Sequence, residues 1–153
     1  MIEVVDTTIK HAKEISLNLR EEDRQEAIAL GQDPIKGVFY IYRSAQRKKT
    51  VLVDGQVAAL AGVGGTILGN AQPFLVTSTV VEKVSPFTFA RVYKQELEDW
   101  KKYFPVLENY VDSRYKGAIR MLKIAGFKIT GPFPMRPNGA LFYKFRLEQQ
   151  VAA

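Results

Sequence analysis

The chain has 153 residues, of which 46% are hydrophobic and 25% are charged, and this balance is typical of one globular domain. It excludes a disordered chain, a collagen-like repeat and a coiled-coil rod. Because the sequence has no cysteine, it can form neither a disulfide nor a thiolate metal site. The formal net charge of +6 at pH 7 favours acidic partners such as nucleic acid or an anionic cofactor, although both signs of charge are interspersed.

The first third of the sequence predicts a short strand followed by helices. Residues 2–5 form the strand, and a threonine after it can cap a helix whose apolar face runs from Ile9 to Leu19. A second helix ends at Gly31. Asp33 and Pro34 open a third helix, because an aspartate side chain caps a first turn that proline fits.

The middle of the chain predicts strands. Asp54-Gly55 is a strong hairpin signal between strands at 50–53 and 56–63. The glycines at 62, 64 and 65 indicate a bulge or break. The remaining predicted elements are a strand at 72–77, a helix at 86–103, a strand at 106–111, a helix at 114–125, a strand at 127–130, a proline-rich turn region at 132–139 and a strand at 140–147.

Two features of this order set the expected fold class. Strands met in succession favour antiparallel pairing, whereas strand–helix–strand units favour parallel pairing. We therefore expect an α/β fold with a mixed sheet of about six to seven strands, flanked by helices on both faces. The domain is expected over residues 1–148, with a short C-terminal tail at 149–153. The low-charge stretch at 55–81 contains five glycines, so it predicts strands and turns and no membrane span.

Two segments near the end of the chain resemble a known superfamily. They are Asn-Tyr-Val-Asp at 109–112 and Ala-Ile-Arg-Met-Leu-Lys-Ile-Ala-Gly-Phe at 118–127. A helix that begins with Ala-Ile-Arg and ends at Gly-Phe is similar to the closing unit of the GNAT superfamily of N-acetyltransferases. The resemblance implies a GNAT-like fold and, for an active enzyme, acetyl-CoA as cofactor.

A narrower family matches motifs scattered along the chain. The chain resembles the internal virion protein A family of short-tailed bacteriophages at seven places. They are His-Ala at 11–12, Asn-Leu-Arg-x-x-Asp-Arg-x-Glu at 18–26, Asp-Gly at 54–55, Gly-Val at 62–63, Pro-Phe-Leu at 73–75, Thr77 and Glu-Asn-Tyr-Val-Asp at 108–112. This resemblance implies a GNAT-like virion component, located in the virion and the infected host cytoplasm. Other phage virion proteins are the implied partners, and a homo-oligomer is an open alternative.

The GNAT resemblance also implies a basic, glycine-rich loop that holds the cofactor diphosphate between the fourth strand and the long helix. The corresponding residues, 79–88, contain no glycine. Pro86 lacks an N–H donor, and Phe87 adds bulk where a phosphate needs close backbone approach. Lys83 and Ser85 remain the candidate cofactor-binding residues in this segment.

The catalytic groups that the resemblance implies are also altered. Leu122 occupies the position of a tyrosine that often serves as general acid, and leucine has no proton to donate. Tyr115 is the remaining candidate acid, and it also aligns with a residue that contacts the cofactor. Glu82 and Glu108 are the candidate bases, because the strand at 72–77 carries no acid. His11, the one histidine, lies on the first helix, away from the expected cleft.

We therefore expect no cofactor and a catalytically degenerate protein that acts through protein contacts. The alternative is an N-acyltransferase that uses acetyl-CoA with an atypical cofactor loop. No metal site is predicted.

Two polar regions remain open to interpretation. Arg43, Arg47, Lys48 and Lys49 form either a solvated helix end or a surface that contacts nucleic acid or an acidic protein. Residues 18–26 form either an exposed ion-paired face or a border of the substrate groove.

Overall fold

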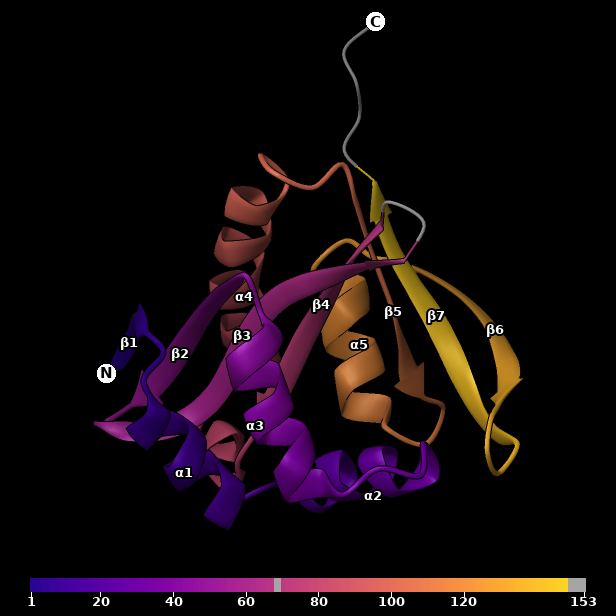
Figure 1. Ribbon diagram of the computed structural model, residues 1–153. Coiled ribbons are helices and arrows are strands. Elements are labelled where there is room, and N and C mark those ends of the chain that lie inside the picture. The colour runs from indigo at the N-terminus through magenta and orange to yellow at the C-terminus, as the bar shows by residue number, and fades with distance from the viewer. Residues whose placement is uncertain (68–69, 149–153) are drawn as a thin grey trace, which may run out of the picture.

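The computed structural model describes residues 1–67 and 70–148, which form a seven-stranded mixed sheet with helices on both faces (Figure 1). The strands are β1 (Ile2–Asp6), β2 (Arg47–Val53), β3 (Gln56–Ile67), β4 (Asn70–Thr77), β5 (Val106–Asp112), β6 (Lys128–Met135) and β7 (Ala140–Glu148). The helices are α1 (Ile9–Leu17), α2 (Glu21–Ala29), α3 (Pro34–Ser44), α4 (Pro86–Trp100), α5 (Lys116–Ile124) and the short 3-10 helix η1 (Thr79–Lys83). The predicted fold class is confirmed. The tail predicted at 149–153 lies outside the described residues.

The strands follow the order β1-β2-β3-β4-β5-β7-β6, and every neighbouring pair except β4 and β5 is antiparallel. The parallel pair β4–β5 has a single register pair, Ala71 with Leu107. The two strands are close at one end of the sheet and separate toward the other (Figure 1). This separation positions the candidate site.

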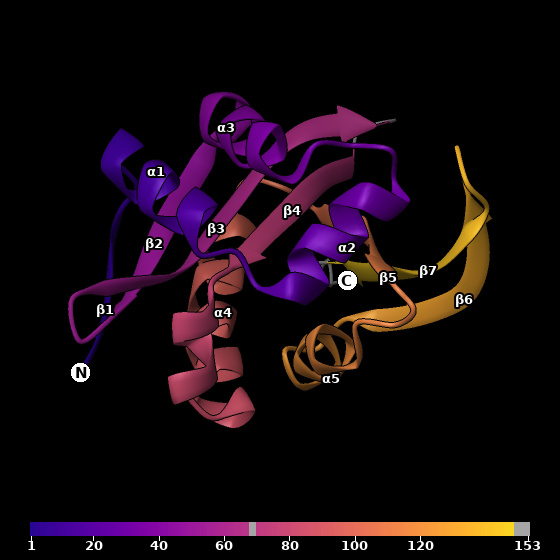
Figure 2. The same ribbon diagram turned by 90° about the horizontal axis from the view of Figure 1, so that it is seen from below.

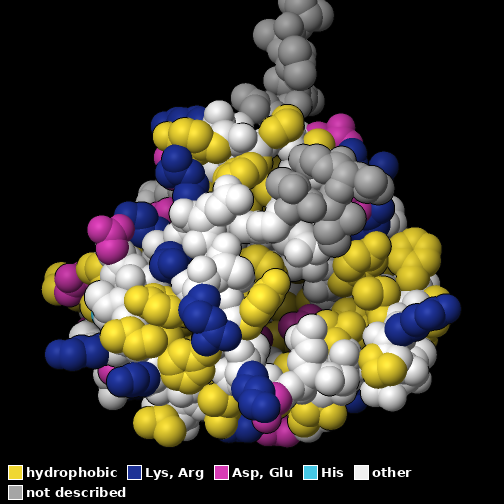
Figure 3. All heavy atoms as spheres, in the orientation of Figure 1, with side chains coloured by type: hydrophobic (Ala, Val, Ile, Leu, Met, Phe, Trp, Pro, Cys, Tyr) yellow, Lys and Arg dark blue, Asp and Glu magenta, His cyan; other side chains and the backbone are white. Residues whose placement is uncertain are grey.

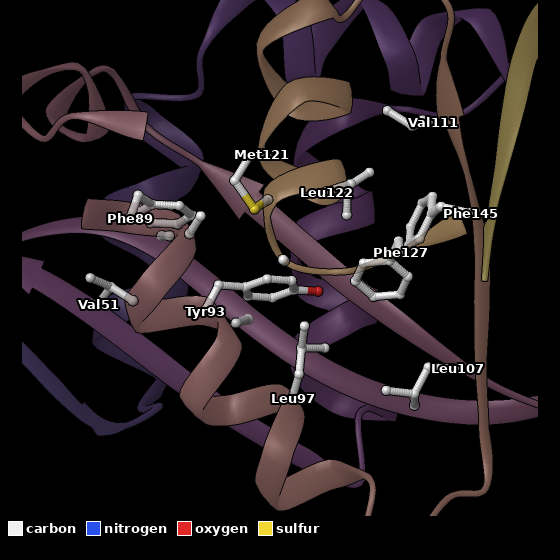
Figure 4. Packing of buried hydrophobic residues seen from close by; sticks show 14 of the residues in the cluster. Val51, Phe89, Tyr93, Leu97, Leu107, Val111, Met121, Leu122, Phe127 and Phe145 are labelled. Carbon is white, nitrogen blue, oxygen red and sulfur yellow. The ribbon is translucent and has the colours of Figure 1, made fainter. Parts of the chain in front are cut away.

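Helices cover the two faces of the sheet with separate hydrophobic cores. On one face, α4 and α5 bury side chains such as Leu97 and Leu122 against the strands (Figure 4). On the other face, Ile15 of α1 and Val38 of α3 pack against Leu60 of β3. Each large buried side chain of this kind stabilises the fold by about 1.5–3 kcal/mol. Helix α2 belongs to neither layer and lies across the end where β4 and β5 separate (Figure 2).

The hairpin predicted at Asp54-Gly55 is confirmed. Asp54 has φ of 50° and Gly55 has φ of 80°, and Val53 pairs with Gln56 across the turn. A two-residue turn with two positive φ values matches the twist of the flanking strands.

The structure corrects the helix-end interpretation of the basic cluster. Helix α3 ends at Ser44, and residues 47–49 begin strand β2, so only Arg43 lies in a last helical turn. The Lys48 ammonium donates to the Tyr42 carbonyl oxygen at 2.7 Å. Because side chains alternate along a strand, residues 47–49 do not form one continuous face.

Two residues of the same cluster have partners within the protein. The Arg47 guanidinium lies 3.4 Å from the centre of the Tyr103 ring and 3.7 Å from an Asp99 carboxylate oxygen. The Lys49 ammonium pairs with Asp6 at 2.7 Å. These ion pairs neutralise part of the positive charge that a surface for acidic partners would need.

Strand β6 is longer than predicted. It runs through Pro132 and Pro134 to Met135, where the sequence indicates a proline-rich turn. The strand lies at the edge of the sheet, so its prolines need not supply a ladder N–H on both sides. The register also shifts between Thr130 and Phe133, which accommodates a bulge.

The bulge predicted near Gly64 and Gly65 is confirmed. The register shifts between Gly64 and Thr66, and Gly65 has φ of 62°. A Cβ at Gly64 would lie 3.0 Å from the Cα of Ala45 and 3.0 Å from the carbonyl oxygen of Ser44. The connection from α3 to β2 therefore packs directly on the backbone of β3.

Gly64→Ala is expected to lower the free energy of unfolding by about 1–3 kcal/mol, because backbone atoms must move to make room for the methyl group. Gly37→Ala in α3 is the matched control, since nothing lies within 4 Å of its added Cβ. The control is expected to retain or gain stability, as alanine favours a helix. Urea unfolding compares the two variants, and an equally stable Gly64→Ala protein would contradict the close approach.

Candidate functional site

A cleft of about 690 Å³ opens where β4 and β5 separate. Residues of α2 and α3 line it on one side of the sheet, and residues of α4 and α5 line it on the other. In the space-filling view, a hollow lies between the helices and the strands, with acidic atoms recessed among hydrophobic side chains (Figure 3). The volume is within the range of about 300–1,000 Å³ that is usual for ligand sites.

The connection between α1 and α2 binds the end of β4 next to this cleft. Leu19 forms an isolated antiparallel bridge with Ser78. The Arg20 N–H donates to the Thr77 carbonyl oxygen at 3.2 Å, and the Thr79 N–H donates to the Asn18 carbonyl oxygen at 3.2 Å. These bonds fix the start of α2 over the last residues of the strand.

Asp23 of α2 points toward the end of β4. Its Oδ2 atom accepts from the Thr77 N–H at 3.2 Å, from the Thr77 hydroxyl group, and from the Tyr115 hydroxyl group at 3.3 Å. Burial raises the pKa of Asp23 to about 6, and the hydrogen bonds and the nearby Arg20 charge oppose this effect. The group therefore titrates close to neutral pH.

Glu26 lies one helical turn later on the same face of α2, because residues three apart are neighbours on a helix. Its Oε1 atom accepts from the Asp112 N–H of β5 at 2.9 Å. Burial raises the pKa of Glu26 to about 8, and the charges of Asp23 and Asp112 raise it further. Glu26 is consequently protonated in most molecules at pH 7. Through these two acids, α2 bridges the separated strands.

Tyr115, which precedes α5, is buried beside Asp23. Its hydroxyl group is 3.1 Å from the Thr77 hydroxyl oxygen, and Arg20 donates to it at 3.5 Å. Burial raises the pKa of Tyr115 above its usual value, so the phenol keeps its proton. The structure thus places this candidate acid in the cleft, next to a carboxylate.

The two candidate bases, Glu82 and Glu108, lie away from Tyr115 and Asp23. Glu82 on η1 is exposed, and its carboxylate is 3.5 Å from the Arg20 Nε atom. Glu108 on β5 is not among the residues that line the cleft. It accepts from Arg146 at 2.8 Å and also pairs with Lys144, and these two cations hold it in place.

The structure also places Leu122, which stands where the resemblance implies an acidic tyrosine, and His11, the one histidine. Leu122 lines the cleft with an aliphatic side chain at the position that the resemblance assigns to a tyrosine. His11 caps α1, where its Nδ1 atom accepts from the Thr8 N–H at 3.1 Å. It does not line the cleft.

The segment between β4 and α4 does not fit a diphosphate. The Val80 N–H donates to the Ser78 hydroxyl oxygen at 3.1 Å, and the Val81 N–H donates to the Ser78 carbonyl oxygen at 3.1 Å. The Val84 N–H donates to the Val81 carbonyl oxygen at 3.1 Å. A phosphate cradle needs such groups free and pointing outward.

The two candidate cofactor-binding residues in this segment are also engaged. Lys83 donates to the Gln56 side chain at 3.1 Å. Ser85 caps α4, because its hydroxyl oxygen accepts from the Thr88 N–H at 3.2 Å. Their contacts support the local fold, and neither side chain is left as a dedicated anion ligand.

Asp23 and Glu26 belong to the motif at 18–26 that carries the phage-family resemblance, but sequence reasoning gave them no role in the site. They belong to the polar stretch at 18–26, for which an exposed face and a groove border were both open. The structure places both acids at the groove. Their three-residue spacing was a visible signal, but their partners Thr77 and Asp112 are more than 50 residues away.

Within residues 1–67 and 70–148, no group of three or more His, Cys, Asp or Glu side chains is arranged to hold a metal ion. In the same residues, no helix is long and apolar enough to cross a membrane.

No family model and no curated protein matches the chain. Solved structures match it over nearly its whole length. One is a GNAT-family acetyltransferase from Bacillus anthracis, with a TM-score of 0.71 and 10% identity over 96% of this chain and 94% of that one. Another is the ribosomal-protein-S18-alanine N-acetyltransferase from Escherichia coli, with a TM-score of 0.64 and 16% identity over 100% and 97%.

A third match is the spermidine N-acetyltransferase from Vibrio cholerae, solved in complex with CoA and spermine. It has a TM-score of 0.69 and 10% identity over 97% of this chain and 95% of that one. At these identities the likeness concerns the fold, and the chain has the GNAT fold.

Glu26→Gln is expected to stabilise the protein at alkaline pH. The folded pKa of about 8 lies above the ordinary glutamate pKa of 4.5, so ionisation of Glu26 costs stability progressively as pH rises between these values. Glutamine keeps the acceptor for the Asp112 N–H and removes the charge. We expect similar stability at pH 4 and a gain of about 2–4 kcal/mol at pH 8.5.

Urea unfolding of both proteins at several pH values measures this difference. Glu21→Gln is the matched control, because Glu21 lies on the exposed side of the same helix. A difference in the free energy of unfolding between Glu26→Gln and the parent that does not change with pH would contradict the raised pKa of Glu26.

Proposed function

The fold of this chain is that of acetyltransferases, yet we propose that it does not transfer acetyl groups. We propose that it acts through protein contacts, as a component of a bacteriophage virion or of its assembly. One observation carries this proposal: backbone N–H groups between β4 and α4 already donate to acceptors within the protein. Cofactor binding there would require those bonds to break.

The cost of that rearrangement is the physical basis of the proposal. Each hydrogen bond within the protein contributes about 0.5–1.5 kcal/mol net, and several would be lost together. The Phe87 side chain is exposed at the start of α4, where the first free N–H groups of the helix lie. Pro86 has no N–H, and the Thr88 N–H already donates to the Ser85 hydroxyl oxygen, so this helix start has few donors for an anion even though its dipole favours negative charge.

The virion assignment rests on the resemblance to the internal virion protein A family. It makes other virion proteins the proposed partners, and the virion and infected host cytoplasm the proposed locations. A nucleic-acid partner has less support, because Arg47 and Lys49 are paired with acids of the same chain.

A second candidate function is N-acyl transfer with acetyl-CoA. One observation favours it: Tyr115 and Asp23 form a proton donor and acceptor pair 3.3 Å apart in the cleft. In that case Asp23 is the base, in place of Glu82 or Glu108. The names of the matched structures keep this candidate open, since one of them was solved with CoA.

We expect titration calorimetry to detect no saturable binding of acetyl-CoA at micromolar concentrations. We also expect no thiol release with polyamine, amino-acid or peptide acceptors. Lys83→Glu serves as the matched variant, because any genuine diphosphate site in this segment would lose affinity when its cation is reversed. Binding that Lys83→Glu abolishes, or turnover that Tyr115→Phe and Asp23→Asn abolish, would establish the enzyme instead.

Mass spectrometry of purified phage particles tests the virion assignment. The chain is expected among the particle proteins after washing with high salt, because protein contacts that bury apolar surface survive screening of charges. A chain that is abundant in the infected-cell lysate and missing from particles would contradict packaging.

A further inference from the structure

Helices α1 and α3 lie side by side on one face of the sheet, and each turns one side outward (Figures 1 and 2). Their inward sides bury residues such as Ile15 and Val38 against β3. The outward residues recur at helical spacing, at 10, 13 and 17 in α1 and at 36, 40 and 43 in α3, and all six are exposed. We call these residues the outer helical face: Lys10, Lys13, Leu17, Lys36, Tyr40 and Arg43.

The outer helical face carries four cations that local acids do not pair. Among the residues that the structure describes, none of the four forms an ion pair. The acids nearest in sequence hold backbone groups. Glu14 accepts from the Val57 N–H at 2.6 Å, and Asp33 caps α3 by accepting from the Ile35 and Lys36 N–H groups at 3.0 Å. The face therefore keeps its positive charge.

Apolar side chains are exposed between these cations. Leu17 is 78% exposed, and Tyr40 is 59% exposed. Leu17 lies one helical turn after Lys13, and Tyr40 lies one turn from both Lys36 and Arg43. Dark-blue and yellow side chains accordingly lie next to each other over α1 and α3 (Figure 3). Both helices thus present the same pattern, an exposed apolar group beside cations.

The arrangement of the apolar groups argues against a lipid surface as the partner. A helix that lies on a membrane buries a whole apolar face at the headgroup boundary. The apolar faces of α1 and α3 are turned inward, where they pack on β3. The outer helical face offers one apolar side chain from each helix.

Nucleic acid also fits this face less well than protein does. Its contacts are dominated by phosphates, which pair with lysine and arginine and gain nothing from an exposed leucine. A protein segment that carries both carboxylates and apolar side chains satisfies both kinds of group on the face.

We propose that the outer helical face binds an acidic amphipathic segment of a partner protein, in which aspartate or glutamate residues flank leucine or aromatic side chains. The carboxylates pair with the four cations, and the apolar side chains cover Leu17 and Tyr40. Complementary charge speeds encounter and selects the partner, and the apolar contacts slow dissociation. The proposal rests on the proposed function, because it names a surface and a partner chemistry for action through protein contacts.

The test uses residues of the face that lie away from the cleft. Lys36 and Tyr40 also border the cleft, whereas Lys13, Leu17 and Arg43 do not. Substitutions at these last three positions therefore report on the outer helical face alone.

The probes are three fluorescein-labelled helical peptides of about 20 residues, long enough to form a helix. The first has leucines at helical spacing with glutamates between them. The second replaces the glutamates with glutamine, and the third replaces the leucines with serine. Fluorescence polarisation is expected to show saturable binding of the first peptide, and binding of the other two that is weaker by about tenfold or more.

Two double variants test the cations. Lys13→Glu with Arg43→Glu is expected to weaken binding of the first peptide by about tenfold or more, because the reversed charges repel its carboxylates. Arg91→Glu with Lys94→Glu is the matched control, since it makes the same change of charge at exposed positions of α4, on the opposite face of the sheet. The control is expected to bind like the parent.

A separate pair of variants tests the apolar contact. Leu17→Gln is expected to weaken binding of the first peptide several-fold, and Leu17→Met is expected to bind like the parent. Circular dichroism and the thermal midpoint check that every variant is folded, as substitutions at such exposed positions allow.

The inference is overturned if the first peptide does not bind, or if it binds no better than either of the other two. It is also overturned if the control double variant loses as much affinity as Lys13→Glu with Arg43→Glu. A DNA duplex and vesicles of phosphatidylserine and phosphatidylcholine are tested in the same way. Tighter binding of either one than of the first peptide, abolished by Lys13→Glu with Arg43→Glu, would assign the face to another class of partner and overturn the inference.

Failure of this inference is distinguishable from failure of the proposed function. A protein that is present in purified particles, transfers no acetyl group and binds none of the peptides refutes the inference alone. Acetyl transfer refutes the proposed function, and the peptide measurements then still decide whether the outer helical face binds an acidic segment.

Discussion

The structure depends on how β4 and β5 are held together after their single register pair. Backbone bonds between the strands end near Ala71, and α2 then bridges the gap with two carboxyl groups. Asp23 bonds to the end of β4, and Glu26 bonds to the end of β5. The two carboxyl groups that hold the halves of the sheet in place therefore also line the cleft.

The connection between α1 and α2 also lies beside the segment that joins β4 to α4. The chain between α1 and α2 pairs with the last residues of β4, and η1 then turns its N–H groups onto Ser78 and Val81. The N–H groups that could donate to an anionic cofactor are therefore already bonded to acceptors within the protein. The GNAT architecture is retained around this altered segment.

Much of the fold could be predicted from the sequence, because local rules determine it. Asp54-Gly55 specifies its turn by backbone preference, and Pro34 marks a helix start. The extent of β6 could not be predicted, because Pro132 and Pro134 are acceptable only on an edge strand, and strand order is a tertiary property. Tyr115 was found through a resemblance. Asp23 and Glu26 were not selected, because residues remote in sequence determine their burial and pKa values.

Hydrogen–deuterium exchange of the amides at 79–89, with and without CoA, tests the central claim most directly. The account predicts that the N–H groups of Val80, Val81, Val84 and Thr88 exchange slowly in the free protein, and that millimolar CoA leaves their rates unchanged. Fast exchange in the free protein that slows when CoA is added would contradict it, since those groups would then be available to a diphosphate.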